Sequence, residues 1–248
     1  MSSDKTTAIL IRQADFSESS KVITWFTQAF GKQATIAKGA KRLKGPFEAA
    51  LDLLTTCEVV ILRKSSAGLD ILTEAKLVKR FTPATGQLIS LYGGYYVAEL
   101  LDALCEEDDP HPELFESVRM TLDRLAAGDD VVLNLSWFEL SLLRELGHLP
   151  TFDACVACGQ PLEEAAVYGF QTEAGGITCP ACLESPEPKR LLSAATLAVF
   201  NQLTTEGENT WQRLLLTSRQ TKELRGILTP LVIQLLGRRP KTLRYLPL

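Results

Sequence analysis

The sequence has 248 residues, 46% of them hydrophobic and 23% charged, which excludes intrinsic disorder and fibrous repeats and suffices for one or two domains with apolar cores. Its net charge of -4 is unevenly distributed: residues 1–82 carry +5, residues 83–150 carry -10, residues 151–185 carry -5 and residues 186–248 carry +6. No apolar run reaches the ~20 residues of a membrane span and the first residues show no signal-peptide pattern, so we expect a cytoplasmic protein without membrane association.

Residues 1–82 contain short runs rich in β-branched residues, separated by turn residues such as Gly31 and Gly68. These runs predict five strands, at residues 8–11, 21–27, 33–37, 57–62 and 71–75. Five strands in so short a segment are typical of a small barrel such as the OB fold, which commonly binds single-stranded nucleic acid.

A basic segment follows the third predicted strand. It contains Lys38, Lys41, Arg42 and Lys44 and is interrupted by glycines, which let the backbone approach a phosphate chain closely. A solvated turn is the alternative, but the barrel context favours nucleic-acid binding. Further cations follow the fourth and fifth strands and would extend the positive surface: Arg63, Lys64, Lys76, Lys79 and Arg80. We expect electrostatic binding without sequence specificity.

Four aromatic residues lie near these cations in the sequence: Trp25, Phe26, Phe30 and Phe47. An exposed aromatic ring would offer bases a stacking surface. Trp25 and Phe26 are neighbours on one strand and point to opposite faces of it. We nevertheless predict that both are buried.

From Gln87 onward the hydrophobic period becomes helical. The pattern predicts helices over residues 88–104, from Asp109 and Pro110 to about residue 125, and over residues 130–146, 193–203 and 220–236. Asp109 would be the N-cap of the second helix and Pro110 its first residue. The pair Gly93 and Gly94 inside the first helix would loosen it or permit close packing.

Four of the six cysteines form two C-x2-C pairs, Cys155 with Cys158 and Cys179 with Cys182. Each pair can turn two sulfurs toward one point, and two pairs supply a tetrahedral thiolate set for one zinc ion. A redox dithiol or chance pairing is the alternative. Zinc held by four cysteines has no open coordination position, so we assign it a structural role.

The cysteine pairs delimit a zinc ribbon at residues 151–185. Gly159 and the pair Gly175 and Gly176 suit its tight turns. The ribbon contains no Lys or Arg, so we expect it to brace the helical domain or to meet a protein partner rather than nucleic acid. Cys57 and Cys105 lie in apolar surroundings and are predicted to be core residues.

Catalytic patterns are missing from the sequence. His111 and His148 are the only histidines, and we interpret both as surface or capping residues. No phosphate-binding G-x-x-x-x-G-K-[ST] motif occurs. The acidic run at residues 106–109 is typical of a solvated helix cap rather than of a metal site. We therefore predict no catalytic residues and no enzyme.

Five motifs occur in order along nearly the whole chain, at residues 17–27 with Gly31, 37–42, 96–101, 138–140 and 146–150, followed by the cysteine pairs. Together they resemble the bacterial RecO family of recombination mediators. Each is weak alone, but their order is specific. The resemblance implies an α+β fold, with an N-terminal five-stranded OB-fold barrel at residues 1–82 and an α-helical domain at 83–248, interrupted by the four-cysteine zinc ribbon.

The resemblance also implies a non-catalytic function in DNA repair and recombination after DNA damage. RecO proteins bind single- and double-stranded DNA, anneal complementary strands, and work with RecR to help RecA replace the single-strand-binding protein. The DNA-binding role would fall on Lys38, Lys41, Arg42 and Lys44. The structural zinc would be held by Cys155, Cys158, Cys179 and Cys182. The protein would be cytoplasmic and nucleoid-associated in a bacterium, and its acidic helical segment would be where protein partners dock.

Three alternatives stay open. An RNA-binding module could use the same barrel and ribbon. A protein-interaction adaptor would use its basic ends only to attract an acidic partner. A zinc hydrolase would require an open metal position.

Overall fold

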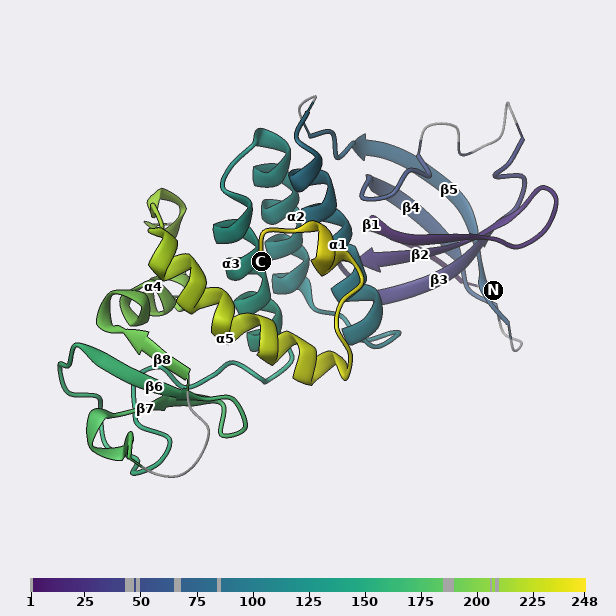
Figure 1. Ribbon diagram of the computed structural model, residues 1–248. Helices are drawn as coiled ribbons and strands as arrows, with labels where there is room; N and C mark the ends of the chain where they lie inside the picture. The colour runs from purple at the N-terminus through teal and green to yellow at the C-terminus, as the bar shows by residue number, and fades with distance from the viewer. Residues whose placement is uncertain are drawn as a thin grey trace. The chain divides into compact units, whose positions relative to one another are not determined.

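The computed structural model describes residues 2–42, 47, 50–64, 68–83, 86–184, 190–205, 207 and 210–248. The chain forms two compact units (Figure 1). Unit 1 comprises Met1–Val131 and Pro240–Leu246, and unit 2 comprises Val132–Arg239 and Pro247–Leu248. The chain therefore leaves unit 1 after Val131, returns to it at Pro240–Leu246, and enters unit 2 again with Pro247–Leu248.

Unit 1 begins with the five predicted strands. They are β1 (Ser3–Asp15), β2 (Lys21–Thr27), β3 (Gly31–Ala37), β4 (Thr56–Leu62) and β5 (Asp70–Lys79). They close into a barrel in the order β1-β2-β3-β5-β4 (Figure 1). Neighbouring strands are antiparallel except β3 and β5, which pair in parallel. This is the α+β class and the five-stranded barrel that the sequence predicts.

The local sequence explains the barrel. Burial alternates along β3, as expected for a strand with one face toward a core. β1 pairs with both β2 and β4, and its register against β2 shifts between Leu10 and Arg12. Such a bulge bends a strand, which allows β1 to serve two neighbours. Trp25 lies in the barrel core, where its indole N–H donates to Thr35 Oγ1 at 3.2 Å.

Two helices of unit 1 follow the barrel, α1 (Leu88–Leu104) and α2 (Pro112–Ala127). Phe26 faces outward from the barrel and stacks on Phe115 of α2, with ring centroids 6.1 Å apart. Both Trp25 and Phe26 are fully buried, which confirms the prediction. The change from strands to helices lies near the predicted boundary at residues 82 and 83, and the division into domains at 1–82 and 83–248 stays a prediction.

Glycines permit close approaches within unit 1. Gly31 has a φ of +67°, and a Cβ there would lie 2.0 Å from the carbonyl oxygen of Asp109. Gly94 of α1 is approached by Leu54 and Phe81, where a Cβ would lie 2.6 Å from a carbon of each. α1 is one continuous helix, so its glycines permit close packing as expected.

The second helix begins two residues later than predicted. Its first residue is Pro112 and its N-cap is His111, so Asp109 and Pro110 precede the helix. The sequence offers two prolines separated by one residue, and either could take the first helical position. Asp108 has a φ of +58° and its backbone N–H donates to the carbonyl of Lys32. The segment between α1 and α2 therefore lies beside β3 at this point and is not yet helical.

The short helix η3 (Thr242–Tyr245) completes unit 1. The Glu99 carboxylate of α1 accepts the backbone N–H of Lys241 at 2.8 Å and that of Thr242 at 2.9 Å. It also accepts the Thr242 hydroxyl at 2.7 Å. Tyr245 stacks on Tyr92 of α1, with ring centroids 4.6 Å apart. One carboxylate thus caps the start of η3.

The described residues of unit 2 form three helices, a small sheet and short 3-10 turns. Its elements are α3 (Val131–Glu145), β6 (Val167–Gln171), β7 (Gly176–Thr178), η1 (Pro180–Cys182), β8 (Arg190–Ser193), α4 (Ala194–Thr204), η2 (Thr210–Arg213) and α5 (Ser218–Leu236). The strands pair in the order β7-β6-β8. Arg225 of α5 is buried against Glu139 of α3, with guanidinium-to-carboxylate distances of 2.6 and 3.0 Å.

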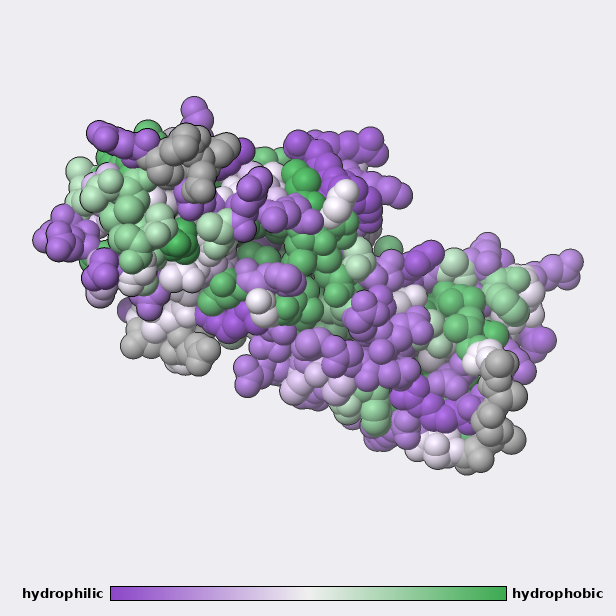
Figure 2. All heavy atoms as spheres, turned by 90° about the horizontal axis from the view of Figure 1, so that it is seen from below, coloured by the Kyte–Doolittle hydropathy of each residue, from purple (hydrophilic) through white to green (hydrophobic). Residues whose placement is uncertain are grey.

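Among the described residues, no helix combines the length and the hydropathy that a membrane crossing needs. On the face in Figure 2, hydrophobic residues form separate patches between hydrophilic ones.

Candidate metal centre and nucleic-acid interface

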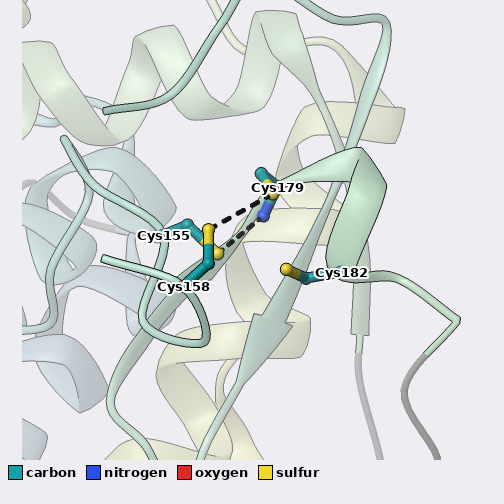
Figure 3. A group of neighbouring side chains, drawn as sticks. All are labelled: Cys155, Cys158, Cys179 and Cys182. Carbon is teal, nitrogen blue, oxygen red and sulfur yellow. Dashed lines mark hydrogen bonds between the residues drawn. The ribbon is translucent and has the colours of Figure 1, made fainter. Parts of the chain in front are cut away.

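The four paired cysteines form one cluster in unit 2 (Figure 3). Their sulfur atoms all lie within 4.8 Å of one another, and Cys158 Sγ is 3.9 Å from Cys179 Sγ. All four thiols are free of disulfides. Cys155 is buried, whereas Cys158 is exposed.

Backbone hydrogen bonds hold the two cysteine turns together. The Gly159 N–H donates to the Cys155 carbonyl at 2.8 Å and closes the first turn, where Gly159 has a φ of +73° as its position predicts. Val156 N–H donates to the Ile177 carbonyl at 2.8 Å, which joins the first turn to β7. Gly176 has no room for a Cβ, which would lie 2.9 Å from the Thr151 carbonyl oxygen.

The donor set fits a metal ion that prefers thiolates. Tetrahedral bonds of ~2.3 Å from zinc place sulfurs about 3.8 Å apart, close to the observed spacing. Burial alone would raise the pKa of Cys155, but backbone N–H groups of residues including Cys179 and Cys158 donate to its sulfur and lower the pKa to about 6, whereas side-chain hydrogen bonding with Cys179 raises the pKa of Cys182 to about 12. Backbone donors stabilise the thiolate, which is the form that binds metal. The cluster can therefore hold one metal ion.

The predicted basic loop follows β3. Lys38, Lys41 and Arg42 are all exposed, but the Lys41 ammonium is turned toward β1 and lies 2.8 Å from the Asp15 carboxylate. The hydrogen bond from Lys41 holds the pKa of Asp15 below its ordinary value. Lys44 lies outside the described residues. The loop therefore offers two outward cations and one that is already paired.

Most of the other barrel cations also have carboxylate partners. Arg63 is held by Asp4 at 2.7 Å and Asp70 at 2.9 Å, which together raise its pKa although its burial opposes this. Lys79 also pairs with Asp123, and Arg80 pairs with Asp52. These cations are engaged in holding unit 1 together and add less to the positive surface than their sequence positions suggest.

The aromatic residues near the loop are mostly structural. Trp25, Phe26 and Phe47 are buried, and Phe30 lies 5.4 Å beneath the Arg63 guanidinium. Sequence reasoning overlooked Phe16, which is 59% exposed at the tip between β1 and β2. An aromatic residue inside a polar turn, just before residues 17–20, was the available signal.

This tip is tied to the basic loop. The Phe16 N–H donates to the Ser20 carbonyl at 3.0 Å and closes the turn. The Lys41 N–H donates to the Ser19 carbonyl at 3.1 Å and joins the loop to it. Phe16 therefore lies on the same part of the barrel as Lys41 and the cations beside it.

Within the described part of the chain, the cysteine cluster is the one group of metal-ligating side chains. The acidic run at residues 106–109 is exposed, as expected for a solvated connection. His111 faces Asp109, 3.2 Å away, and His148 is exposed. Cys57 and Cys105 are core residues as predicted, and burial raises the pKa of Cys105 to about 12.

Comparison with known proteins places these features in context. The model of the recombination protein O N-terminal region matches residues 1–81, and that of the recombination protein O C-terminal region matches residues 86–244. A protein of Rhodopirellula baltica named DNA repair protein RecO is 35% identical, with 97% of each chain covered. The RecO protein of Anaeromyxobacter sp. (strain K) is 33% identical over 98% of this chain and 95% of its own.

Proposed function

The chain belongs to the RecO family of DNA repair proteins, with a role in repair and recombination, and from this premise we propose that it is a non-catalytic recombination mediator. It binds single- and double-stranded DNA, anneals complementary strands, and assists RecA loading together with RecR as the single-strand-binding protein is displaced. Its site of action is the bacterial cytoplasm at the nucleoid.

The observation that carries this proposal is the exposed basic loop of the barrel, beside the exposed ring of Phe16. Lys38 and Arg42 supply charge to phosphates, and Phe16 supplies a face on which a base stacks. Lys44 is the third proposed phosphate contact, whereas Lys41 is held by Asp15. None of these groups reads base edges, so binding is independent of sequence.

Annealing follows from charge neutralisation. Two DNA strands repel each other through their phosphates, and cations that screen one strand lower the barrier to pairing with another. No covalent chemistry is needed for this activity.

We propose that the cysteine cluster holds one structural Zn²⁺ through Cys155, Cys158, Cys179 and Cys182. These residues come from two turns, so a bound ion would cross-link the turns, and four thiolates would leave it no position for water or substrate. A hydrolase would need such a position. The described part of the ribbon, 151–184, contains no Lys or Arg, so we expect it to meet protein rather than DNA.

The test is fluorescence anisotropy of a labelled single-stranded DNA oligonucleotide at several salt concentrations. Each phosphate that the protein neutralises adds about 0.7 to the steepness of log affinity against log salt, so three phosphates give a slope near -2. Lys38→Gln with Arg42→Gln should remove two of these three interactions. Lys5→Gln is the control, because Lys5 lies on β1 and pairs with Glu58.

The outcomes separate the alternatives. Tighter binding of an RNA oligonucleotide of the same sequence would favour an RNA-binding module. Absence of binding to either at low salt would refute the proposal and leave an adaptor. Equal weakening in the loop variant and in the Lys5→Gln control would refute the loop assignment alone.

A further inference from the structure

Unit 2 contains an open cleft of about 540 Å³ beside α5. One side of it is a single face of the helix, because residues 218, 222, 226, 229 and 233 recur at helical spacing. Arg190 at the start of β8 and Arg239 beyond the end of α5 complete the rim, and Pro247 and Leu248 add an apolar wall. Neither the loop of the barrel nor the cysteine cluster contributes to this cleft.

The cleft is positively charged. Arg190, Lys222 and Arg239 are exposed, and no acidic residue lines the cleft. In the described segments, no carboxylate forms an ion pair with these three cations. Arg225, the fourth basic residue of the lining, is neutralised by the buried Glu139. Within the described part of unit 2, three cations therefore face solvent without an acidic side chain paired to them.

The nearest acidic residue on the helix is turned away. Glu223 accepts hydrogen bonds from the Ser193 N–H at 2.9 Å and from the hydroxyls of Ser193 and Thr196 at 2.7 and 2.5 Å. Its other oxygen is paired with Arg219 at 2.7 Å. These contacts hold its charge at the junction of β8 and α4 and leave the cleft basic.

The cleft also contains a backbone acceptor. Pro230 lies inside α5 and has no N–H, so the helix lacks the usual donor to the carbonyl four residues earlier, that of Gly226. A Cβ at Gly226 would meet no atom within 4 Å, so the helix backbone is open to a ligand there. A ligand that carries both negative charge and hydrogen-bond donors matches this lining.

We propose that this cleft is a second DNA site, which binds the phosphates of a single strand through Arg190, Lys222 and Arg239. Base amino or imino groups donate to the Gly226 carbonyl. The inference rests on the proposed function and deepens it, because annealing requires two strands to be held by one protein. A polyanion such as DNA gains more from three uncompensated cations than a short acidic peptide does, because it releases condensed counterions.

The experiment is a stoichiometric titration of the full chain with a labelled single-stranded oligonucleotide of about eight nucleotides, short enough to occupy one site. The wild-type chain should bind two. The cleft variant Arg190→Gln with Lys222→Gln should bind one tightly, with the second weakened about 25-fold at 0.1 M salt because two phosphates are no longer neutralised. Arg213→Gln with Arg238→Gln is the matched control, since both lie outside the cleft lining.

The barrel variant Lys38→Gln with Arg42→Gln should also retain one oligonucleotide, and annealing should fall in both variants. If the wild-type chain binds one oligonucleotide, and only the barrel variant fails to bind it, the second site is overturned and the proposed function stands. No oligonucleotide on the wild type would refute the proposed function itself. A polyglutamate peptide is the probe for an acidic protein partner. If it binds the wild type but not the cleft variant, and both bind the same number of oligonucleotides, DNA is overturned as the occupant of the cleft.

Discussion

Replacing Asp15 with Asn should strengthen DNA binding. In unit 1 the Asp15 carboxylate holds the Lys41 ammonium at 2.8 Å, and Asp15 itself is exposed. The substitution keeps the shape of the side chain, removes its charge, and frees Lys41 for a phosphate. Most substitutions near a binding loop weaken binding, so the predicted direction is distinctive.

The size of the effect follows from the number of available cations. If Lys38 and Arg42 contact phosphates with Lys44, the salt slope is about -2.1, and with Lys41 released it becomes about -2.8. If variant and wild type bind equally at 1 M salt, one added phosphate interaction makes the variant bind about fivefold more tightly than the wild type at 0.1 M salt. Lys41→Gln should therefore cost little in the wild type, but should cancel the gain in the Asp15→Asn variant.

Anisotropy titrations across salt measure both quantities. Glu58→Gln is the control, because it makes the same charge change on β4, where Glu58 pairs with Lys5 of the neighbouring strand β1. An unchanged slope for Asp15→Asn, or an equal gain from Glu58→Gln, would refute the reasoning. The first result would mean that Lys41 contacts no phosphate, and the second that net charge alone sets affinity.

Three further predictions concern stability and metal. Gly31→Ala should destabilise the protein by at least about 3 kcal/mol in denaturant unfolding, because its Cβ would lie 2.0 Å from the Asp109 oxygen, whereas Gly86→Ala, with open space around it, should cost only about 1 kcal/mol. Burial would raise the pKa of Glu223, but its hydrogen bonds lower this pKa from 4.5 to about 2. The contribution of Glu223 to the free energy of unfolding is therefore complete above pH 4.5 and is lost as the pH falls through 2. Glu223→Gln should cost about 1–3 kcal/mol at pH 7, and equal pH profiles of unfolding for variant and wild type would contradict this. Chelation should release one zinc ion per chain in a colorimetric assay and expose the ribbon to protease, while Cys182→Ser should bind metal more weakly; full protease resistance without metal would contradict a structural role.

The parts of the fold that depend on local sequence could be predicted. The spacing of the cysteine pairs determines which sulfurs can meet, and the φ values of Gly159 and Gly175 agree with the turns expected beside them. Five strands follow from runs of β-branched residues, because each run is bounded by a turn. The family resemblance added the order of the domains.

Features that depend on distant partners could not be predicted. A basic residue in a loop has the same sequence signal whether it faces solvent, as Lys38 does, or pairs with a strand residue, as Lys41 does with Asp15. Arg63 is likewise fixed by Asp4, 59 positions away. The α5 cleft joins Arg190 to Lys222 and Arg239, which no local pattern connects.

The return of residues 240–246 to unit 1 has a consequence for biosynthesis. The ribosome releases the barrel and α1 early, yet the backbone donors that occupy the Glu99 carboxylate emerge only after all of 132–239. Until then Tyr92 also lacks the Tyr245 ring that stacks on it. While the chain is shorter than this, α1 therefore lacks the partners of both Glu99 and Tyr92, and the last contacts of unit 1 form only after the residues of unit 2 up to 239 have been synthesised.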